Sequence, residues 1–203
     1  MKQTTEAIVL GLRKHSDKMS VLHVYSRSEG RLALQVYGAH SKHKVRAAYQ
    51  PLSIVEITYT QPPTRSVPAL SAIDTVFLPE KIVTDIRRQS VALFVTEILL
   101  LTVTHPMQDD ALYGFLDAYV HELNDTSVPE NMHLFFLVRM ADYLGIGMPQ
   151  SNADASETED IRHASLSRHQ RKKMLQEFCD YYLTHIDSFR FPKSLDVLTE
   201  IFN

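Results

Sequence analysis

The sequence predicts an α+β protein in which a small β-barrel precedes an all-α helical half. Apolar residues alternate with a period of two before residue 80 and recur with a helical period after it. The pair Pro62-Pro63 and the single Pro79 interrupt the chain on either side of the last alternating segment. We therefore expect two units, residues 1–80 and residues 81–203.

Five short alternating segments make up the first unit. The first places Ile8, Leu10 and Leu12 on one face, and a turn at 28–30 precedes the third. The expected strands cover residues 8–12, 21–25, 32–36, 54–60 and 69–77. Five strands joined by loops of unequal length are typical of a closed barrel, and we expect an OB-fold.

The second unit carries clear helix boundaries. Thr84 or Asp85 is placed to cap a helix over 86–103, and another helix is expected over 109–123. Two Ser-x-x-Glu/Gln patterns, at 127–130 and 167–170, predict capping boxes. The first pattern begins a helix that is expected to end at Leu144, before Gly145. The second begins a helix that is expected to end at about His185. The acidic segment 150–160 is expected to be a solvated loop, and 194–202 a closing helix.

The charge is unevenly distributed along the chain. Residues 1–50 hold nine Lys and Arg against three Asp and Glu, whereas the whole chain has a formal net charge of −3. Clustered cations gain affinity for phosphates by displacing counterions. The N-terminal part is therefore expected to bind a polyanion.

The densest basic segment lies between the third and fourth expected strands. It contains Lys42, Lys44 and Arg46, and the chain has no acidic residue between Glu29 and Glu56 to pair with them. Loops at the end of an OB barrel contact nucleic acids. We expect these three side chains to contact phosphates.

Further cations could extend the same basic surface. Those of the first connection are Arg13, Lys14 and Lys18, and Arg27 lies beside the next turn. In the third strand, Arg31 and Tyr37 share the face opposite the apolar residues, as expected for a surface that follows a DNA backbone and stacks on a base. The alternative is an ordinary solvated outer face.

The helical half has basic residues beside apolar helix faces. Such edges suit an acidic, hydrophobic peptide tail, with solvated helix faces as the alternative interpretation. The residues concerned are Arg87, Arg88, Arg168, Arg171 and Lys172.

The sequence offers little for catalysis or metal binding. His40 and His43 have no Cys pair or carboxylate nearby to complete a zinc site, and Ser41 lacks the companion motifs of an acyl-transfer enzyme. The single Cys179 excludes an intramolecular disulfide and, in an apolar helical face, is expected to be buried. The apolar run 91–103 contains Glu97 and is shorter than the roughly 20 residues that a membrane span needs. We expect a cytoplasmic, non-enzymatic protein with no metal, cofactor or membrane contact.

Several segments of the first unit follow one another in a distinctive order. They are an apolar strand, a Ser-Asp-Lys hairpin, a Glu-Gly turn, a glycine plus basic loop and a Gln-Pro strand, at 7–10, 16–18, 25–30, 37–42 and 50–52. In this order they resemble the N-terminal domain of the RecO family. Segments 181–185 and 193–198 also resemble RecO proteins, particularly those of the Bacteroidetes. The chain departs from many members of the family because it has one cysteine and so lacks their four-cysteine zinc module.

The resemblance implies a recombination mediator of the RecF pathway, built from an OB-fold and a helical domain. Such a protein binds single- and double-stranded DNA, anneals complementary strands and helps RecR to load RecA onto DNA covered by single-stranded DNA-binding protein. It also implies that the acidic C-terminal tail of that protein is a partner of the helical half. The alternative is a protein-interaction adaptor whose contact with DNA is incidental.

Overall fold

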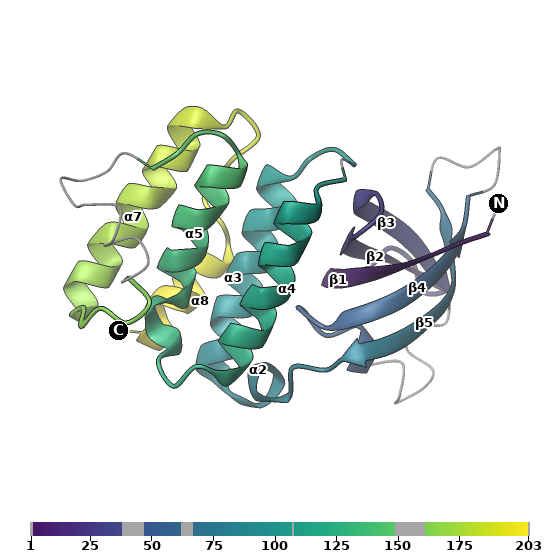
Figure 1. Ribbon diagram of the computed structural model, residues 1–203, viewed down its shortest axis with the longest axis horizontal. Helices are drawn as coiled ribbons and strands as arrows, with labels where there is room; N and C mark the ends of the chain where they lie inside the picture. Colours follow the sequence, from purple (N-terminus) through teal and green to yellow (C-terminus); the bar gives the residue numbers. More distant parts are fainter. Residues whose placement is uncertain (1, 38–46, 62–66, 107, 149–160, 203) are drawn as a thin grey trace.

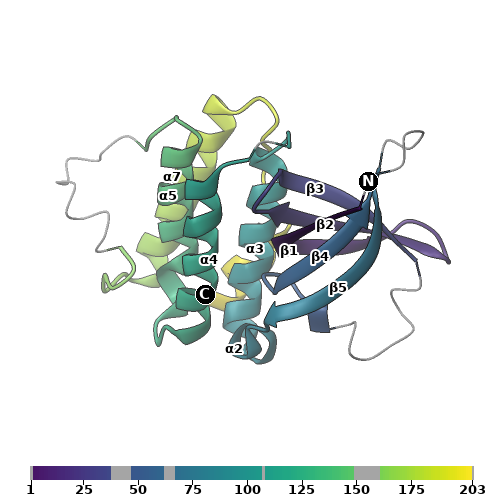
Figure 2. The ribbon, with the colours of Figure 1, turned by 45° about the vertical axis from the view of Figure 1, so that its right-hand side comes forward.

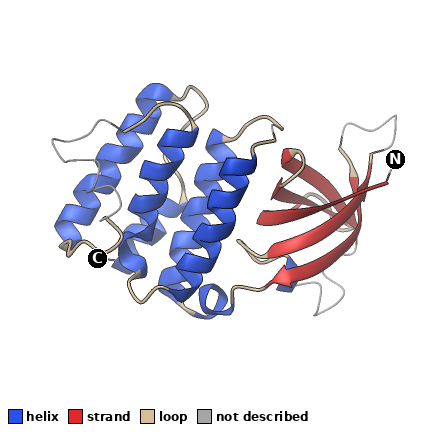
Figure 3. Ribbon diagram, viewed as in Figure 1, coloured by secondary structure: helices blue, strands red, loops and turns tan. Residues whose placement is uncertain are grey.

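The computed structural model describes residues 2–37, 47–61, 67–106, 108–148 and 161–202. Five strands come first, and every helix of four or more turns follows them in the chain. Figure 1 shows the strands at one end of the molecule and the helices at the other, and Figure 3 shows the same division by element type. The predicted α+β class is confirmed.

The strands form a closed barrel in the order β1-β2-β3-β5-β4. All neighbouring strands are antiparallel except β3 and β5, which meet in a short parallel contact. This order, with a parallel closure between the third and fifth strands, is the topology of an OB-fold. The strands are β1 Lys2–Lys14, β2 Met19–Ser26, β3 Gly30–Tyr37, β4 Ile54–Thr60 and β5 Ala69–Phe77.

The first strand contains a bulge that the alternation of its apolar residues did not predict. Its register against β2 shifts between Val9 and Gly11, where Gly11 has φ +150°. Ile8 and Leu10 face the helices, but Leu12 packs with the barrel interior, because the extra residue changes which face the following side chains occupy. The expectation that Leu12 shares a face with Ile8 and Leu10 was therefore wrong.

The helices begin and end close to the predicted residues. The helical half consists of α2 Glu80–Thr84, α3 Ile86–Thr102, α4 Asp110–Asp125, α5 Met132–Tyr143, α7 Arg168–His185 and α8 Ser194–Phe202, with a 3-10 turn η1 at Pro129–Asn131. Asp85 caps α3, and the predicted capping box of Ser167 and Gln170 opens α7. The acidic segment 150–160, expected to be a solvated loop, lies outside the described residues.

The predicted capping box at 127–130 is wrong. No side chain caps the turn η1, and Glu130 instead pairs with Arg87, their Oε1 and Nη1 atoms 2.6 Å apart. The local pattern was correct for a helix start, but a tertiary ion pair takes the glutamate and the chain forms a 3-10 turn before α5.

Two clusters of buried residues hold the molecule together. One fills the barrel with residues such as Val9, Leu22 and Leu34. The other extends from the outer face of the barrel, at Ile8 and Tyr25, through the helices. Figure 2 shows α3 beside the ends of β1, β2 and β3, so part of the barrel surface is covered by helix and part is open.

Candidate nucleic-acid interface

The open part of the barrel presents a row of polar side chains on β1, β2 and β3. Arg13 is opposite Val21, which is opposite Gln35, and Gly11, His23 and Ala33 align in the next row. Arg31 and Tyr37 lie on the same side of β3, because Leu32, Leu34 and Val36 point into the barrel and are buried. We call Arg13, His23, Arg31, Gln35 and Tyr37 the strand face.

The bulge at Gly11 puts Arg13 on this face. After the bulge, Leu12 pairs with Leu22 and points into the barrel, so Arg13 points outward. Continued alternation from Ile8 without a bulge would have turned Arg13 into the barrel. A glycine inside an alternating strand is a recognised sign of a bulge, and it is the feature of the sequence that could have predicted this orientation.

Positive charge is concentrated on the strand face. The pKa of the His23 imidazole is lowered by burial and, further, by the charges of Arg31 and Arg13. The pKa of Arg31 is lowered by burial and by Arg13. Within the described residues, Arg13 forms no ion pair with Asp or Glu. A group of like charges without a neutralising partner favours an anion beside it.

Arg31 also has a structural role. Its Nη1 donates to the carbonyl oxygens of Leu100 and Val103, at 2.9 and 2.7 Å. These carbonyls lie at the C-terminal end of α3, where a cation is favoured by the helix dipole. Arg31 therefore joins the barrel to α3.

Arg27 lies at the same boundary, in the turn that follows β2. Its guanidinium is 3.8 Å from Glu6 and 5.6 Å from the ring centre of Tyr113 on α4. The Tyr113 hydroxyl donates to Glu6 at 3.0 Å. The structure thus gives Arg27 two neighbours within the protein, Glu6 and Tyr113.

The hairpin between β1 and β2 adds exposed cations beside the strand face. Lys14 pairs with Asp17 at 2.8 Å, with both side chains largely exposed, and Lys18 is also exposed. Tyr37 is opposite Met19 at the base of this hairpin, and 59% of its surface is exposed. An exposed aromatic ring beside lysines is the arrangement in which a base can stack while its phosphates are neutralised.

The basic loop with Lys42, Lys44 and Arg46 lies outside the described residues, as do His40, Ser41 and His43. Tyr37, the last residue of β3, ends the described chain just before it. The role expected for these three cations therefore stays a prediction.

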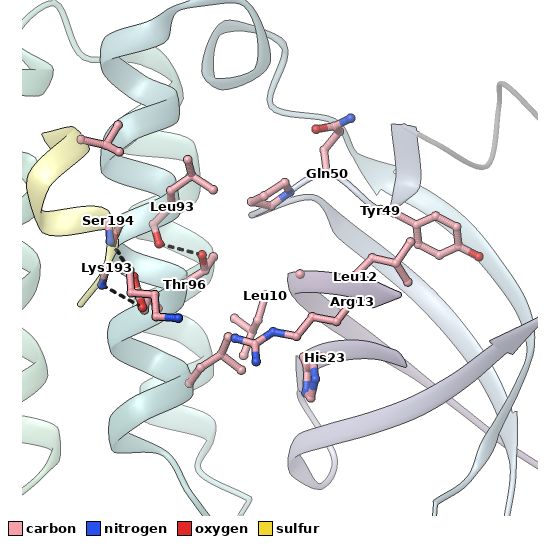
Figure 4. Close-up of a pocket in the computed structure, with 15 residues that line it drawn as sticks. Leu10, Leu12, Arg13, His23, Tyr49, Gln50, Leu93, Thr96, Lys193 and Ser194 are labelled. Atoms are coloured by element: carbon pink, nitrogen blue, oxygen red, sulfur yellow. Dashed lines mark hydrogen bonds between the residues drawn. The ribbon is translucent and has the colours of Figure 1, made fainter. Parts of the chain in front are cut away.

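A groove of about 810 Å³ separates the strand face from the helical half. Figure 4 shows Arg13 and His23 on the barrel side, with Leu93, Thr96, Lys193 and Ser194 on the helical side. Neither His23 nor Lys193 was among the site residues predicted from the sequence. The alternation of β2 could have placed His23 on the strand face, but no local pattern brings Lys193 to it.

The five cations predicted to hold a peptide tail fall into two groups. Arg87 pairs with Glu130, while Arg88 pairs with Asp85 and donates to the Leu123 carbonyl at 3.2 Å. The second group lies on α7, and its members Arg168, Arg171 and Lys172 line a small hollow together with His133, Leu175, Leu198, Thr199 and Phe202.

The hollow on α7 contains buried nitrogen atoms without partners. The Nε of Arg171 and the Nδ1 of His133 are buried and accept or donate no hydrogen bond among the described residues, although Nη1 of Arg171 donates to Leu166. The cations lie in the first turns of α7, where the helix dipole disfavours positive charge. An anion at this position would relieve that repulsion.

Cys179, the single cysteine of the chain, is not accessible as a nucleophile. Cys179 is fully buried, and burial raises the pKa of its thiol to about 12. No three His, Cys, Asp or Glu side chains in the described ranges are grouped so as to hold a metal ion. Among the described helices, none is both long and apolar enough to cross a bilayer.

Known proteins of one family are similar to this chain over its whole length. The family model for the N-terminal part of recombination protein O matches residues 1–78, and the model for its C-terminal part matches residues 83–187. The DNA repair protein RecO of Flavobacterium johnsoniae is 27% identical, with all of both chains covered. That of Porphyromonas gingivalis is 25% identical over 98% of each chain, and that of Bacteroides fragilis (strain YCH46) is 23% identical over all of both.

Proposed function

Because this chain belongs to the RecO family, which acts in DNA repair and recombination, we propose that it is a non-catalytic recombination mediator. It binds single- and double-stranded DNA, anneals complementary strands and, with RecR, assists the loading of RecA onto DNA covered by single-stranded DNA-binding protein. Such a role places it in the cytoplasm. The strand face, with its unneutralised Arg13, is the observation that carries the proposal.

The DNA contact is proposed for the strand face, the first hairpin and the basic loop. OB-folds bind nucleic acids on the face of strands 2 and 3 and on the loops at its ends. Here that face carries Arg13, Arg31 and Tyr37, and the hairpin beside it carries Lys14 and Lys18. Lys42, Lys44 and Arg46 follow directly after β3 in the sequence and would extend the same contact. Arg27 has two partners inside the protein, so it would support DNA binding by stabilising the boundary between the barrel and the helices.

Annealing would follow from charge neutralisation. Two complementary strands repel each other through their phosphates, and a basic surface that binds one strand lowers the local repulsion against the second. Stacking of bases on Tyr37 would keep the base edges accessible, because a ring contacts the face of a base and not its pairing edge. No bond of the DNA is broken in this process, so no nucleophile or metal is required.

The hollow on α7 is proposed to bind the acidic C-terminal tail of single-stranded DNA-binding protein. Arg168, Arg171 and Lys172 would attract its carboxylates, and Leu198 and Phe202 would contact its apolar side chains. Arg87 and Arg88, which already pair with Glu130 and Asp85, would support this half of the protein and not contact the tail directly. If the tail were the main partner, the chain would act as a protein-interaction adaptor.

A salt titration tests the DNA contact and separates it from the adaptor function. Binding of a fluorescent single strand is measured by anisotropy for the wild type and for Lys42, Lys44 and Arg46 changed together to Glu. If about five phosphates are neutralised, log affinity should fall against log salt with a slope of about −3.5, and the triple variant should bind weakly with a shallower slope.

The matched control changes Arg168, Lys172 and Lys173 to Glu, which alters the formal net charge of the chain by the same amount. This control should keep its DNA affinity but lose binding to a peptide that ends in acidic and aromatic residues. Equal DNA affinity for the wild type and both variants would remove the basic loop from the mechanism.

A further inference from the structure

The groove beside the strand face has positive charge on both sides. Arg13 extends into it from β1, and Lys193 lines it from the segment that precedes α8 (Figure 4). Both side chains are exposed, and neither forms an ion pair with Asp or Glu in the described ranges. Two unpaired cations on opposite walls of one groove favour an anion between them.

Among the described residues that line the groove, the one carboxylate is already used inside the protein. Glu97 of α3 accepts hydrogen bonds from the backbone N–H groups of Lys193 and Ser194, at 3.0 and 2.9 Å, and from the Ser194 hydroxyl at 2.7 Å. These bonds hold its charge against the N-terminus of α8. Glu97 keeps its negative charge, which also acts on Lys193, so an anion in the groove is favoured nearer to Arg13 and to the Lys193 ammonium group than to Glu97.

The wall between these charges is apolar and accessible. Leu93 of α3 and Val197 of α8 line the groove, with 46% and 44% of their surfaces exposed. Exposed apolar side chains next to cations suit a ligand that combines negative charge with flat, apolar surface. A nucleotide has both, in its phosphate and in the face of its base.

The continuity of the positive charge favours a nucleic acid over an acidic peptide. Arg13 belongs both to the groove and to the strand face, where Arg31 is the next cation in the row. A ligand that lies along this row needs negative charges at regular intervals, as a single strand of DNA has them. The hollow on α7 is separate and has its own cations for a carboxylate ligand.

We infer that single-stranded DNA leaves the strand face through this groove, with a phosphate between Arg13 and Lys193 and a base against Leu93 and Val197. This inference rests on the proposed DNA binding of the barrel and extends it. It makes the helical half part of the DNA-binding surface, with Lys193 as the residue that contributes it.

The change Lys193→Ala tests the inference on the full chain. Removal of one phosphate contact should reduce the magnitude of the salt slope by about 0.7 and weaken the binding of a long single strand by about fivefold at about 0.1 M salt. An OB-fold covers about 4–16 nucleotides. The loss should therefore appear with a strand of about 25 nucleotides and disappear with one of about 5, which the barrel alone can cover. The control is Lys173→Ala, because Lys173 is an exposed lysine of the helical half that does not line the groove.

The apolar contact has a separate test. Val197→Asp places a negative charge in the proposed path and should weaken the binding of the long strand more than Lys193→Ala does. The thermal unfolding midpoint of the variant shows that it is folded. If both groove variants bind long strands as Lys173→Ala does, the inference is wrong.

The groove variants and the triple loop variant test different statements, so one can fail while the other stands. If the triple loop variant loses DNA binding while the groove variants keep it, the proposed function stands and the groove is not part of it. If Lys193→Ala weakens the binding of an acidic peptide and leaves the binding of DNA unchanged, the groove binds a peptide and the inference is also wrong.

Discussion

Arg31 of β3 donates a hydrogen bond of 2.7 Å from Nη1 to the carbonyl oxygen of Val103, which follows the last residue of α3. The same nitrogen donates to Leu100 at 2.9 Å. One side chain of the proposed DNA surface therefore also fixes the position of the helix that forms the opposite wall of the groove. DNA affinity and the docking of the two halves are coupled at this residue.

We predict that Arg31→Met lowers the free energy of unfolding by about 2 kcal/mol. The change removes two hydrogen bonds from a charged donor and a cation that stabilises a helix C-terminus, while it keeps most of the apolar stem. Urea unfolding followed by circular dichroism measures the loss. Arg13→Met is the control, because Arg13 has no such carbonyl partners among the described residues and should change stability by less than about 0.5 kcal/mol. Equal stability of the two variants would show that the bonds to α3 contribute nothing.

Gly11→Ala should destabilise the protein by about 1–2 kcal/mol. The φ of Gly11 is +150°, a conformation that an L-residue adopts only with strain. Apart from its two chain neighbours, no described residue has an atom within 4 Å of the position of the new Cβ. Gly114→Ala in α4 is the control, because this glycine also has open space around it but has ordinary helical geometry. That change should stabilise the protein by about 0.5–1 kcal/mol. If thermal unfolding shows that both substitutions change stability in the same direction, the role given to the bulge is contradicted.

Local patterns in the sequence predicted the elements of this fold well. Alternation located the five strands, and Asp85, Asp109 and Ser167 each cap the helix that they were expected to open or begin. These features depend on residues within one or two turns of each other, so the sequence displays them directly. Cys179 was likewise expected to be buried, and it is.

The site depends on contacts that no local pattern contains. Lys193 lines the same groove as Arg13 because α8 packs on α3, where Glu97 accepts hydrogen bonds from the start of α8. Arg31 is bonded to carbonyls that follow it by about 70 residues. The bulge at Gly11 also reverses the face of Arg13 through one backbone angle. The sequence alone predicted which types of residue lie on the proposed DNA surface. Which residues surround them depends on how the barrel and the helices pack together.

Glu97→Ala should loosen α8 and cost about 1–2 kcal/mol, the range for loss of a helix cap. Burial opposes ionisation of this carboxyl, but the hydrogen bonds from Ser194 and from the Lys193 backbone, together with the charge of Lys193, outweigh it and lower its pKa. A lowered pKa in the folded state means that the stabilisation is present above the ordinary value and is lost as the pH falls through the folded value. Hydrogen exchange should accelerate in α8 and much less in α4. Uniform acceleration would indicate that Glu97 supports the whole helical half and not α8 alone.

Cys179 should report unfolding. Burial raises the pKa of its thiol to about 12, so at pH 8 the native protein contains almost no thiolate and offers a reagent no access to it. Ellman's reagent should therefore react slowly with the native protein and rapidly in denaturant. The variant Val197→Cys provides an exposed thiol on α8 for comparison and should react at once. Rapid reaction of the native wild type would show that the helical core opens readily.

His133 should make the protein sensitive to mild acid. Burial and, to a smaller extent, the charge of Arg171 lower the pKa of this fully buried imidazole to about 3, whereas an unfolded histidine titrates near 6.5. The unfolded chain therefore binds more protons between these values, and stability falls as the pH decreases from 6.5 toward 3. From pH 7 to pH 5 the loss should be about 2 kcal/mol.

The residues around His133 define the test of this acid sensitivity. Phe94 packs edge-on against the imidazole, Phe202 stacks on it, and Arg171 is the charged group that lowers its pKa from α7. His133→Leu keeps an apolar side chain in this environment and removes the titrating group, so its stability should change much less between pH 7 and pH 5 than that of the wild type. Urea unfolding at both pH values measures the difference. If the two proteins lose equal stability, other groups cause the acid sensitivity and His133 has no part in it.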